Sequence, residues 1–287
     1  TDTYTHQRRN WFKSTVLSTK LDYVLSDKTA MQINGLYDKI YVDADITIDH
    51  QDKTENVVTN DVMTFDWKRD TWEISGDITH ELNQNNNLKL LFVSHREDSN
   101  DQIWRETLLG DNKRQLDYQL PRLYTTTENI LRGTWKHTLD ARHSFDSGLE
   151  AAVNGQEDDI QFIEDVDTLY HSTEINDIEE RRYEAFFNYN FAVSPNLNIL
   201  TSLVYEKSTL DVATSYSLIS EENDGASSES SRTFNYLKPR LNIRYDIDDV
   251  YQARFNYERT VSQLDLTDFV PEFNRDETRL EETNPDL

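Results

Sequence analysis

Histidine paired with aspartate is the first constellation to seek in this chain, because such pairs carry general acid–base hydrolysis near neutral pH. One group of this kind lies in a long polar connection between predicted strands, and it consists of His95, Asp98 and Asp101. A hydrolase built on a β-barrel would carry its catalytic residues in such a connection. Closeness in sequence does not establish catalytic geometry, so a solvated loop is the favoured interpretation. The seven histidines are His6, His50, His80, His95, His137, His143 and His171.

Carboxylates are abundant enough to suggest cation binding, as in "VDADITID" (42–49) and "DVDTLYHSTEINDIEE" (165–180). Neither stretch has the D-x-[DN]-x-[DN]-G order of a dedicated calcium loop. A solvated acidic surface is favoured, with loose divalent-cation bridging to lipopolysaccharide phosphates as a second hypothesis. The chain has no G-x-S-x-G and no phosphate-cradling glycine loop. We therefore predict no catalytic residue, no metal site and no cofactor.

Composition narrows the class of protein. The 287 residues include 29 basic and 54 acidic side chains, a net charge of −25, which argues against a nucleic-acid partner. Mean hydropathy is −0.79, and no apolar run of about 18 residues exists, so a transmembrane helix is excluded. A membrane β-barrel remains possible, because only alternate residues of its strands face lipid.

Strict alternation identifies the elements. In "RLNIRYDIDDVYQARFNYERTV" (240–261), apolar and polar side chains alternate on both sides of "DIDD". This pattern predicts a β-hairpin with one apolar and one polar face. Four further hairpins with short turns recur at intervals of similar length. Their turns are "LSDKT" near Asp27, "NQNNN" near Asn85, "LDARH" near Ala141 and "VSPNL" near Pro195. About ten strands follow.

The connections between these hairpins differ from the turns. Gly155 to Glu180 holds ten acidic residues, and "SEENDGASSESS" (220–231) reads as a mobile loop. Short turns at one end and long loops at the other are typical of transmembrane barrels rather than soluble sandwiches. We predict an all-β, antiparallel, up-and-down transmembrane β-barrel, partial, with short periplasmic turns and long extracellular loops. A soluble all-β binding module is an alternative.

The two faces of the predicted strands have separate roles. Tyrosines on the apolar face predict an aromatic girdle at the membrane interface. The polar face predicts a wall that meets water or a plug. For ligand contact we select Trp104, Arg105 and Tyr118, which could stack on or pair with a ligand between residues 96 and 123. The girdle tyrosines are Tyr23, Tyr37, Tyr189, Tyr205, Tyr245 and Tyr257. The wall residues are Asp77, Glu81, Lys89, Arg132, Lys136, Asp146, Glu150, Arg244, Arg254 and Glu258.

The series of hairpins resembles a known family. "TFDWKRDTWEISGDITHELNQNNNLKLLFVSHRED", "HSFDSGLEAAVNG", "YEAFFNYNFAVSPNLNILTSLVYEKSTLD" and "FNYLKPRLNIRYDIDDVYQARFNYERTVSQLDLTDFVPEFN" are similar to the β-barrel of TonB-dependent outer-membrane receptors. The closing "ETNPDL" (282–287) resembles the family's "GNPxLxPE" segment, with Thr283 in place of glycine.

The resemblance implies a 22-stranded barrel, filled by a plug, that imports ferric siderophores, vitamins or oligosaccharides. The implied partners are outer-membrane lipid and lipopolysaccharide, the plug and remaining strands, a small-molecule or oligosaccharide substrate, and an inner-membrane energy-transducing complex. About ten strands and no plug ahead of Thr1 indicate one domain, residues 1–287, cut from the middle of such a receptor. The alternative is a complete small outer-membrane barrel, serving as a pore or a hydrolase with its site at the rim, whose first and last strands would pair.

Overall fold

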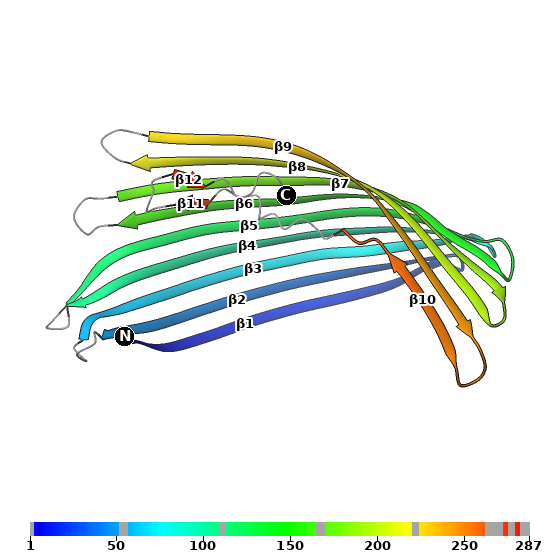
Figure 1. Cartoon of the computed structure of the whole chain (residues 1–287), viewed down its shortest axis with the longest axis horizontal. Helices are drawn as coiled ribbons and strands as arrows, with labels where there is room; N and C mark the ends of the chain where they lie inside the picture. Colours follow the sequence, from blue (N-terminus) through cyan, green and yellow to red (C-terminus); the bar gives the residue numbers. More distant parts are fainter. Residues whose placement is uncertain are drawn as a thin grey trace.

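The computed structural model describes the backbone of residues 3–51, 57–109, 113–164, 170–219, 224–261, 272–274 and 279–281. Ten strands form one antiparallel sheet in sequence order (Figure 1). They are β1 (Thr3–Ser26), β2 (Thr29–Gln51), β3 (Val57–Asn83), β4 (Asn86–Leu109), β5 (Lys113–Thr138), β6 (His143–Glu164), β7 (Tyr170–Ser194), β8 (Leu197–Ile219), β9 (Asp224–Asp246) and β10 (Gln252–Glu258). Two short strands, β11 (Glu272–Asn274) and β12 (Arg279–Glu281), form a separate pair. The described residues contain no helix long and apolar enough to cross a membrane.

All five predicted short turns are confirmed, and they lie at one end of the sheet (Figure 1). Aspartates close two of them. Asp140 accepts hydrogen bonds from the backbone N–H groups of Arg142 and His143, at 2.7 and 3.0 Å. Asp248 accepts from those of Val250 and Tyr251, at 2.8 and 2.7 Å. An Asp side chain that replaces a backbone acceptor in this way stabilises a tight turn.

The loops at the other end of the sheet are shorter than predicted. Most of the segment from Gly155 to Glu180 belongs to β6 and β7, and Asp224 to Ser231 of the serine-rich stretch belongs to β9. The backbone ladder pairs these segments without a break, as between Val212 and Ser230. Alternation is hidden there because polar side chains occupy both faces. The segment "ETNPDL" lies outside the described residues.

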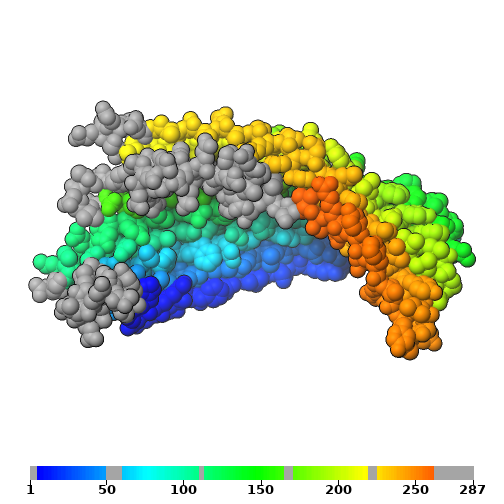
Figure 2. Space-filling model, in the orientation of Figure 1, coloured from blue at the N-terminus to red at the C-terminus, as the bar shows by residue number. Residues whose placement is uncertain are grey.

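The sheet is open. Among the described strands, β1 pairs with β2 alone and β10 pairs with β9 alone. The sheet curves and twists, so that β10 and the part of β9 next to the turn run steeply across the view in which most of β1 to β5 lies nearly level (Figures 1 and 2). The pairing of first and last strands that a complete ten-stranded barrel requires does not occur in the described part of the chain.

The outer face of the sheet is the one that carries exposed apolar side chains. Along β3, these run from Trp72 to Leu82, next to the turns. A tilted strand needs about 9–11 residues to cross a bilayer, which matches this belt. We call the belt and the inner face behind it the turn half, and the strands beyond it the distal half. Five of the predicted girdle tyrosines are exposed on the outer face, namely Tyr23, Tyr37, Tyr205, Tyr245 and Tyr257.

The inner face is the opposite one, and it holds what buried core the sheet has. In the distal half, Ile178, Leu210 and Val212 pack together, with Phe234 against them. The remaining buried positions of this face are mostly polar, which is typical of a wall that faces a hydrated lumen rather than a protein core. This face positions the site.

Candidate functional site

A row of charged side chains crosses four strands of the inner face. In the sheet register, Glu150 of β6 lies opposite Glu184 of β7, which lies opposite Glu206 of β8. Arg132 of β5 begins the row opposite Glu150. Like charges directly opposite each other destabilise a sheet. Three adjacent carboxylates therefore require cations between them.

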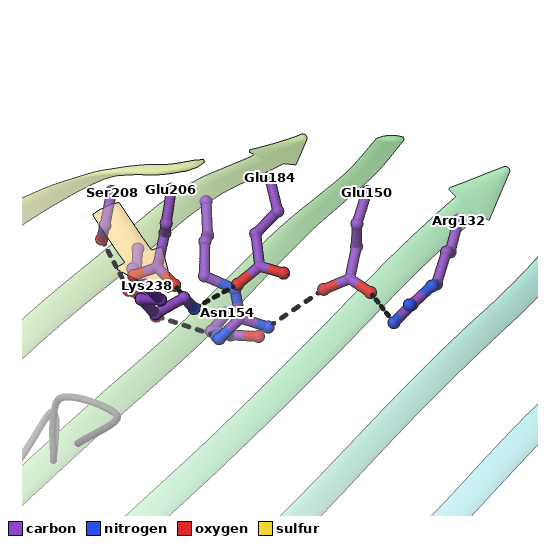
Figure 3. Close-up of polar contacts among 9 residues, drawn as sticks. Arg132, Glu150, Asn154, Glu184, Glu206, Ser208 and Lys238 are labelled. Carbon is purple, nitrogen blue, oxygen red and sulfur yellow. Dashed lines mark hydrogen bonds and ion pairs between the residues drawn. The ribbon is translucent and has the colours of Figure 1, made fainter. Parts of the chain in front are cut away.

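Three cations supply that compensation (Figure 3). Lys238 of β9 contacts Glu184 at 2.8 Å and Glu206 at 2.5 Å. Arg132 and Arg182 approach the two oxygens of Glu150 at 3.3 and 3.4 Å. The side chains of all three glutamates are less than a fifth exposed, so removing one cation would leave a poorly solvated carboxylate.

A second polar group continues the wall one step toward the distal half. Glu180, 3% exposed, accepts hydrogen bonds from Ser208 at 2.6 Å and from Asn154 at 3.0 Å (Figure 3). Further along, the hydroxyl of Thr214 donates to the side-chain oxygen of Asn176 at 2.8 Å. These buried polar groups tie β6, β7 and β8 together through side chains as well as through the backbone.

An aromatic ring packs over a glycine beside the row of charges. A Cβ built on Gly148 would come within 2.5 Å of the Phe186 ring and 2.1 Å of the Gly133 carbonyl oxygen. The guanidinium of Arg132 lies 4.3 Å from the centroid of the same ring. Gly148 is therefore required for the Phe186 ring to approach the backbone closely. The ring covers the backbone there, where a larger residue would cover it with its own side chain.

The distal half of the inner face holds further ion pairs. Arg122 makes a bidentate contact with Asp158, both bonds at 2.7 Å, and Asp158 is 4% exposed. Arg105 contacts Asp61 at 2.6 Å. These hydrogen bonds raise the pKa of both guanidinium groups above its usual value, so both stay charged. Burial raises the pKa of Asp101, which receives one hydrogen bond, from Ser99 at 2.7 Å.

The structure places two of the three predicted ligand-contact residues together. Arg105 of β4 and Tyr118 of β5 are cross-strand partners on the inner face. The Tyr118 ring lies 5.5 Å from that of Phe162. Trp104 precedes Arg105 in the same strand and therefore occupies the outer face. The three side chains do not converge on one point.

The His95, Asp98 and Asp101 group is not assembled. His95 and Asp101 share the inner face but stand three pleats apart, and Asp98 is on the outer face. His95 lies 4.0 Å from Glu73, whereas Asp98 contacts Arg96 at 2.7 Å. That bond lowers the pKa of Asp98, which keeps it ionised rather than able to act as an acid.

The acidic stretches form no metal centre in the part of the chain that the structure describes, since no three His, Asp or Glu side chains there gather closely enough to hold an ion. On β2, Asp45 instead accepts a hydrogen bond from Thr64 at 3.2 Å. Residues 165–169 of the second stretch lie outside the described residues. Divalent-cation bridging to lipopolysaccharide stays a prediction.

Sequence reasoning missed most of the charged row, although it placed Arg132 and Glu150 on the polar wall. The signal was available, because short turns fix the register of each hairpin. Counting outward from the turn at 139–142 pairs Arg132 with Glu150, and counting from Pro195 pairs Glu184 with Glu206. Lys238 lies one pleat away from that row along β9. It therefore contacts Glu184 and Glu206 only because its side chain is long.

A family model described as "TonB dependent receptor-like, beta-barrel" matches residues 4–287. A comparison with curated protein sequences found no match. Among solved structures, the ferric-catecholate import receptor Fiu of Escherichia coli K12, in its closed form, matches with a TM-score of 0.54 at 8% identity, covering 90% of this chain and 49% of Fiu. The chain thus spans about half the length of Fiu.

Two other structures match more distantly. The siderophore receptor PiuA of Acinetobacter baumannii has a TM-score of 0.43 at 9% identity, with 86% of this chain and 47% of PiuA covered. The outer membrane protease OmpT of Escherichia coli has a TM-score of 0.32 at 11% identity, with 84% and 96% covered. The family match over nearly the whole chain, with an open sheet that superposes on half of a receptor barrel, settles the family. The chain belongs to the TonB-dependent receptors, as part of their outer-membrane β-barrel.

Proposed function

We propose that this chain is the barrel portion of a receptor that imports a scarce nutrient, a ferric siderophore, a vitamin or an oligosaccharide, and that it performs no chemistry itself. The observation that carries the proposal is the division of the sheet. An apolar belt covers the outer face of the turn half, and charged groups on the inner face neutralise one another in a continuous wall. Such a wall is suited to line a passage.

In this proposal the plug and the remaining strands complete the passage, and an inner-membrane energy-transducing complex drives transport through the plug. Arg105 and Tyr118 contact the ligand from the inner face of the distal half. Trp104, proposed with them, would reach a ligand only at the extracellular rim, because it lies on the outer face.

The test uses the full-length receptor that contains this chain, produced in a Gram-negative strain without its own receptors for the chosen ligands. Uptake of a labelled ferric siderophore, a corrinoid vitamin and an oligosaccharide is measured with and without an uncoupler. We expect one ligand class to accumulate, and accumulation to cease with the uncoupler. Cleavage of a peptide at the cell surface without uptake would overturn the proposal in favour of a hydrolase.

Point variants then examine the ligand contacts. Tyr118→Ala removes an aromatic surface, and we expect ligand affinity to fall roughly 3- to 10-fold. Arg105→Gln removes a charged donor and should cost more, about tenfold or above. Trp104→Ala should have the smallest effect. Equal effects of all three on affinity would contradict the assignment of faces.

A further inference from the structure

A shallow groove crosses the outer face of the turn half. It encloses about 480 Å³ and lies over β3 to β6. Its lining is mostly apolar, with Ile78, Leu88, Leu90, Trp135 and Leu149 around the floor. Since the chain belongs to an outer-membrane family, this face meets lipid, so the natural contents of the groove are hydrocarbon.

Gly133 forms the floor of the groove. Its cross-strand partners are Leu90 on β4 and Leu149 on β6, whose side chains stand on either side of it. A Cβ added at Gly133 would meet no other heavy atom within 4 Å. This glycine differs from Gly148, which is required for close packing. At Gly133 the missing side chain leaves open space that no described part of the protein fills.

A hydrogen-bonded rim borders the groove on the side of the turns. The backbone N–H of Asn85 donates to the side-chain oxygen of Asn83 at 3.0 Å, and the Asn86 amide N–H donates to the same atom at 2.7 Å. These two donors fix the orientation of both amides. The side-chain oxygen of Asn86 therefore points to Trp135 Nε1 at 3.0 Å and to His137 Nδ1 at 2.6 Å.

This rim also fixes the tautomer of His137. An amide oxygen only accepts, so Nδ1 must carry the proton that it donates to Asn86. In the neutral imidazole, Nε2 is then an acceptor. The described residues offer Nε2 no hydrogen-bond donor, and the ring packs beside Phe145 with centroids 5.1 Å apart. His137 Nε2 is thus an unsatisfied acceptor on the outer face, close to the turns.

We propose that this surface binds a single phospholipid of the periplasmic leaflet that has a primary ammonium headgroup, such as phosphatidylethanolamine. One acyl chain lies in the groove over Gly133, and the ammonium donates a hydrogen bond to His137 Nε2. Gly133 and His137 share the outer face of β5, four residues and so about 13 Å apart, which is within the length of one acyl chain. The short turns lie on the periplasmic side in this family. The rim that holds the headgroup is therefore nearer the periplasm than the groove that holds the acyl chain, as in a lipid of the periplasmic leaflet.

The experiment uses the full-length receptor extracted with its surrounding lipid, with bound lipid counted and identified by native mass spectrometry. We expect one retained phosphatidylethanolamine in the unmodified protein. Gly133→Leu fills the groove and should lower retention roughly tenfold, because several methylene groups lose their contact. Ala185→Leu adds a similar bulk to the outer face of β7, outside the groove, and should retain the lipid. Gly133→Val is the second filling variant, in case the first does not fold.

The headgroup is tested by exchange against vesicles of equal parts phosphatidylethanolamine and phosphatidylglycerol. His137→Phe keeps a ring but removes the acceptor, so the preference for phosphatidylethanolamine should disappear, whereas His143→Phe should keep it. Undiminished retention in Gly133→Leu or Gly133→Val would overturn the site. An unchanged preference for phosphatidylethanolamine in His137→Phe would overturn the headgroup assignment. Retention of lipopolysaccharide alone would overturn the assignment to the periplasmic leaflet.

Discussion

The turn half and the distal half of this sheet share the same strands and the same ladder but meet different surroundings. In the turn half, Leu149 on the outer face is 69% exposed although it is apolar. In the distal half, charged pairs such as Lys39 with Asp70, 2.9 Å apart, occupy the same face. The backbone pairing is the same on both sides of this change, because the ladders between neighbouring strands from β1 to β9 continue past it. Strand length is therefore set by backbone pairing, and the membrane boundary by the outer side chains alone.

One charge placed on the outer face of each half tests whether the two halves differ. Leu149→Arg puts a guanidinium in the apolar belt and should cost about 2–4 kcal/mol, the range for a charge on the lipid face near the midplane. Ala213→Arg adds the same side chain to the outer face of the distal half, at an exposed position, and should change stability by less than about 0.5 kcal/mol. Denaturant-dependent folding of the full receptor into liposomes measures both. Equal costs would show that the belt is not the lipid boundary.

The charged row on the inner face provides the next test. Lys238→Met leaves Glu184 and Glu206 facing each other without a cation. We expect a loss of about 2 kcal/mol, below the 3–5 kcal/mol of a fully buried pair, because the lysine is 22% exposed. Adding Glu206→Gln should restore most of the loss. Arg181→Met, which breaks the exposed pair with Asp211 in the distal half, should leave the midpoint unchanged.

Two glycines of β6 extend the comparison to packing. Gly148→Ala forces a Cβ against the Gly133 carbonyl and the Phe186 ring, and should cost about 1–3 kcal/mol. Gly155→Ala meets the Thr127 hydroxyl at 2.8 Å, a side chain that can rotate away, and should cost less than about 0.5 kcal/mol. The two variants are compared in the same folding assay. A larger effect at Gly155 would mean that the distal half is the more tightly packed of the two.

The smallest effect concerns pH and the neighbouring acids of β4 in the distal half. Burial raises the pKa of Asp101, so the native state holds its proton more tightly than the unfolded chain does. Its contribution to stability is therefore present below about pH 4 and is lost as pH rises through the raised native pKa. In Asp101→Asn, the free energy of unfolding should vary less with pH over that range.

Asp98→Asn is the matched control, since the hydrogen bond from Arg96 lowers the pKa of Asp98. The stability that it contributes is present above about pH 4 and is lost as pH falls through the lowered native pKa. Asp98→Asn should therefore lose stability near neutral pH, where Asp101→Asn gains it. Unfolding midpoints measured from pH 3 to pH 7 check both signs, and a shared sign would contradict the two environments.

The sequence predicted the turn half well because its two faces differ in polarity. There, alternation such as that from Leu241 to Ile247 identifies each strand, and the turn residues fix where it ends. In the distal half both faces are polar, so Asp224 to Ser231 resembled a loop although the ladder with β8 holds it extended. Composition cannot separate a hydrated strand from a hydrated loop, because the pairing partner decides between them.

The candidate site was predicted less completely than the fold. Proximity in sequence suggested that Trp104 and Arg105 act together, yet adjacent residues of a strand face opposite ways. Arg105 is also held by Asp61, 44 residues earlier, a contact that only the register of β3 and β4 reveals. The glycine groove carries no signal in the sequence, since it depends on which neighbours surround Gly133.

The two outer edges of the sheet have no paired neighbour among the described strands, and this has a practical consequence. The register of each pair is set within its own hairpin, so this sheet does not need the rest of a barrel to define which residues align. Its outermost strands are templates that a second polypeptide could complete. A separately made polypeptide with matching edge strands should therefore pair with β1 and β10 by edge recognition, without any change in the register inside this sheet.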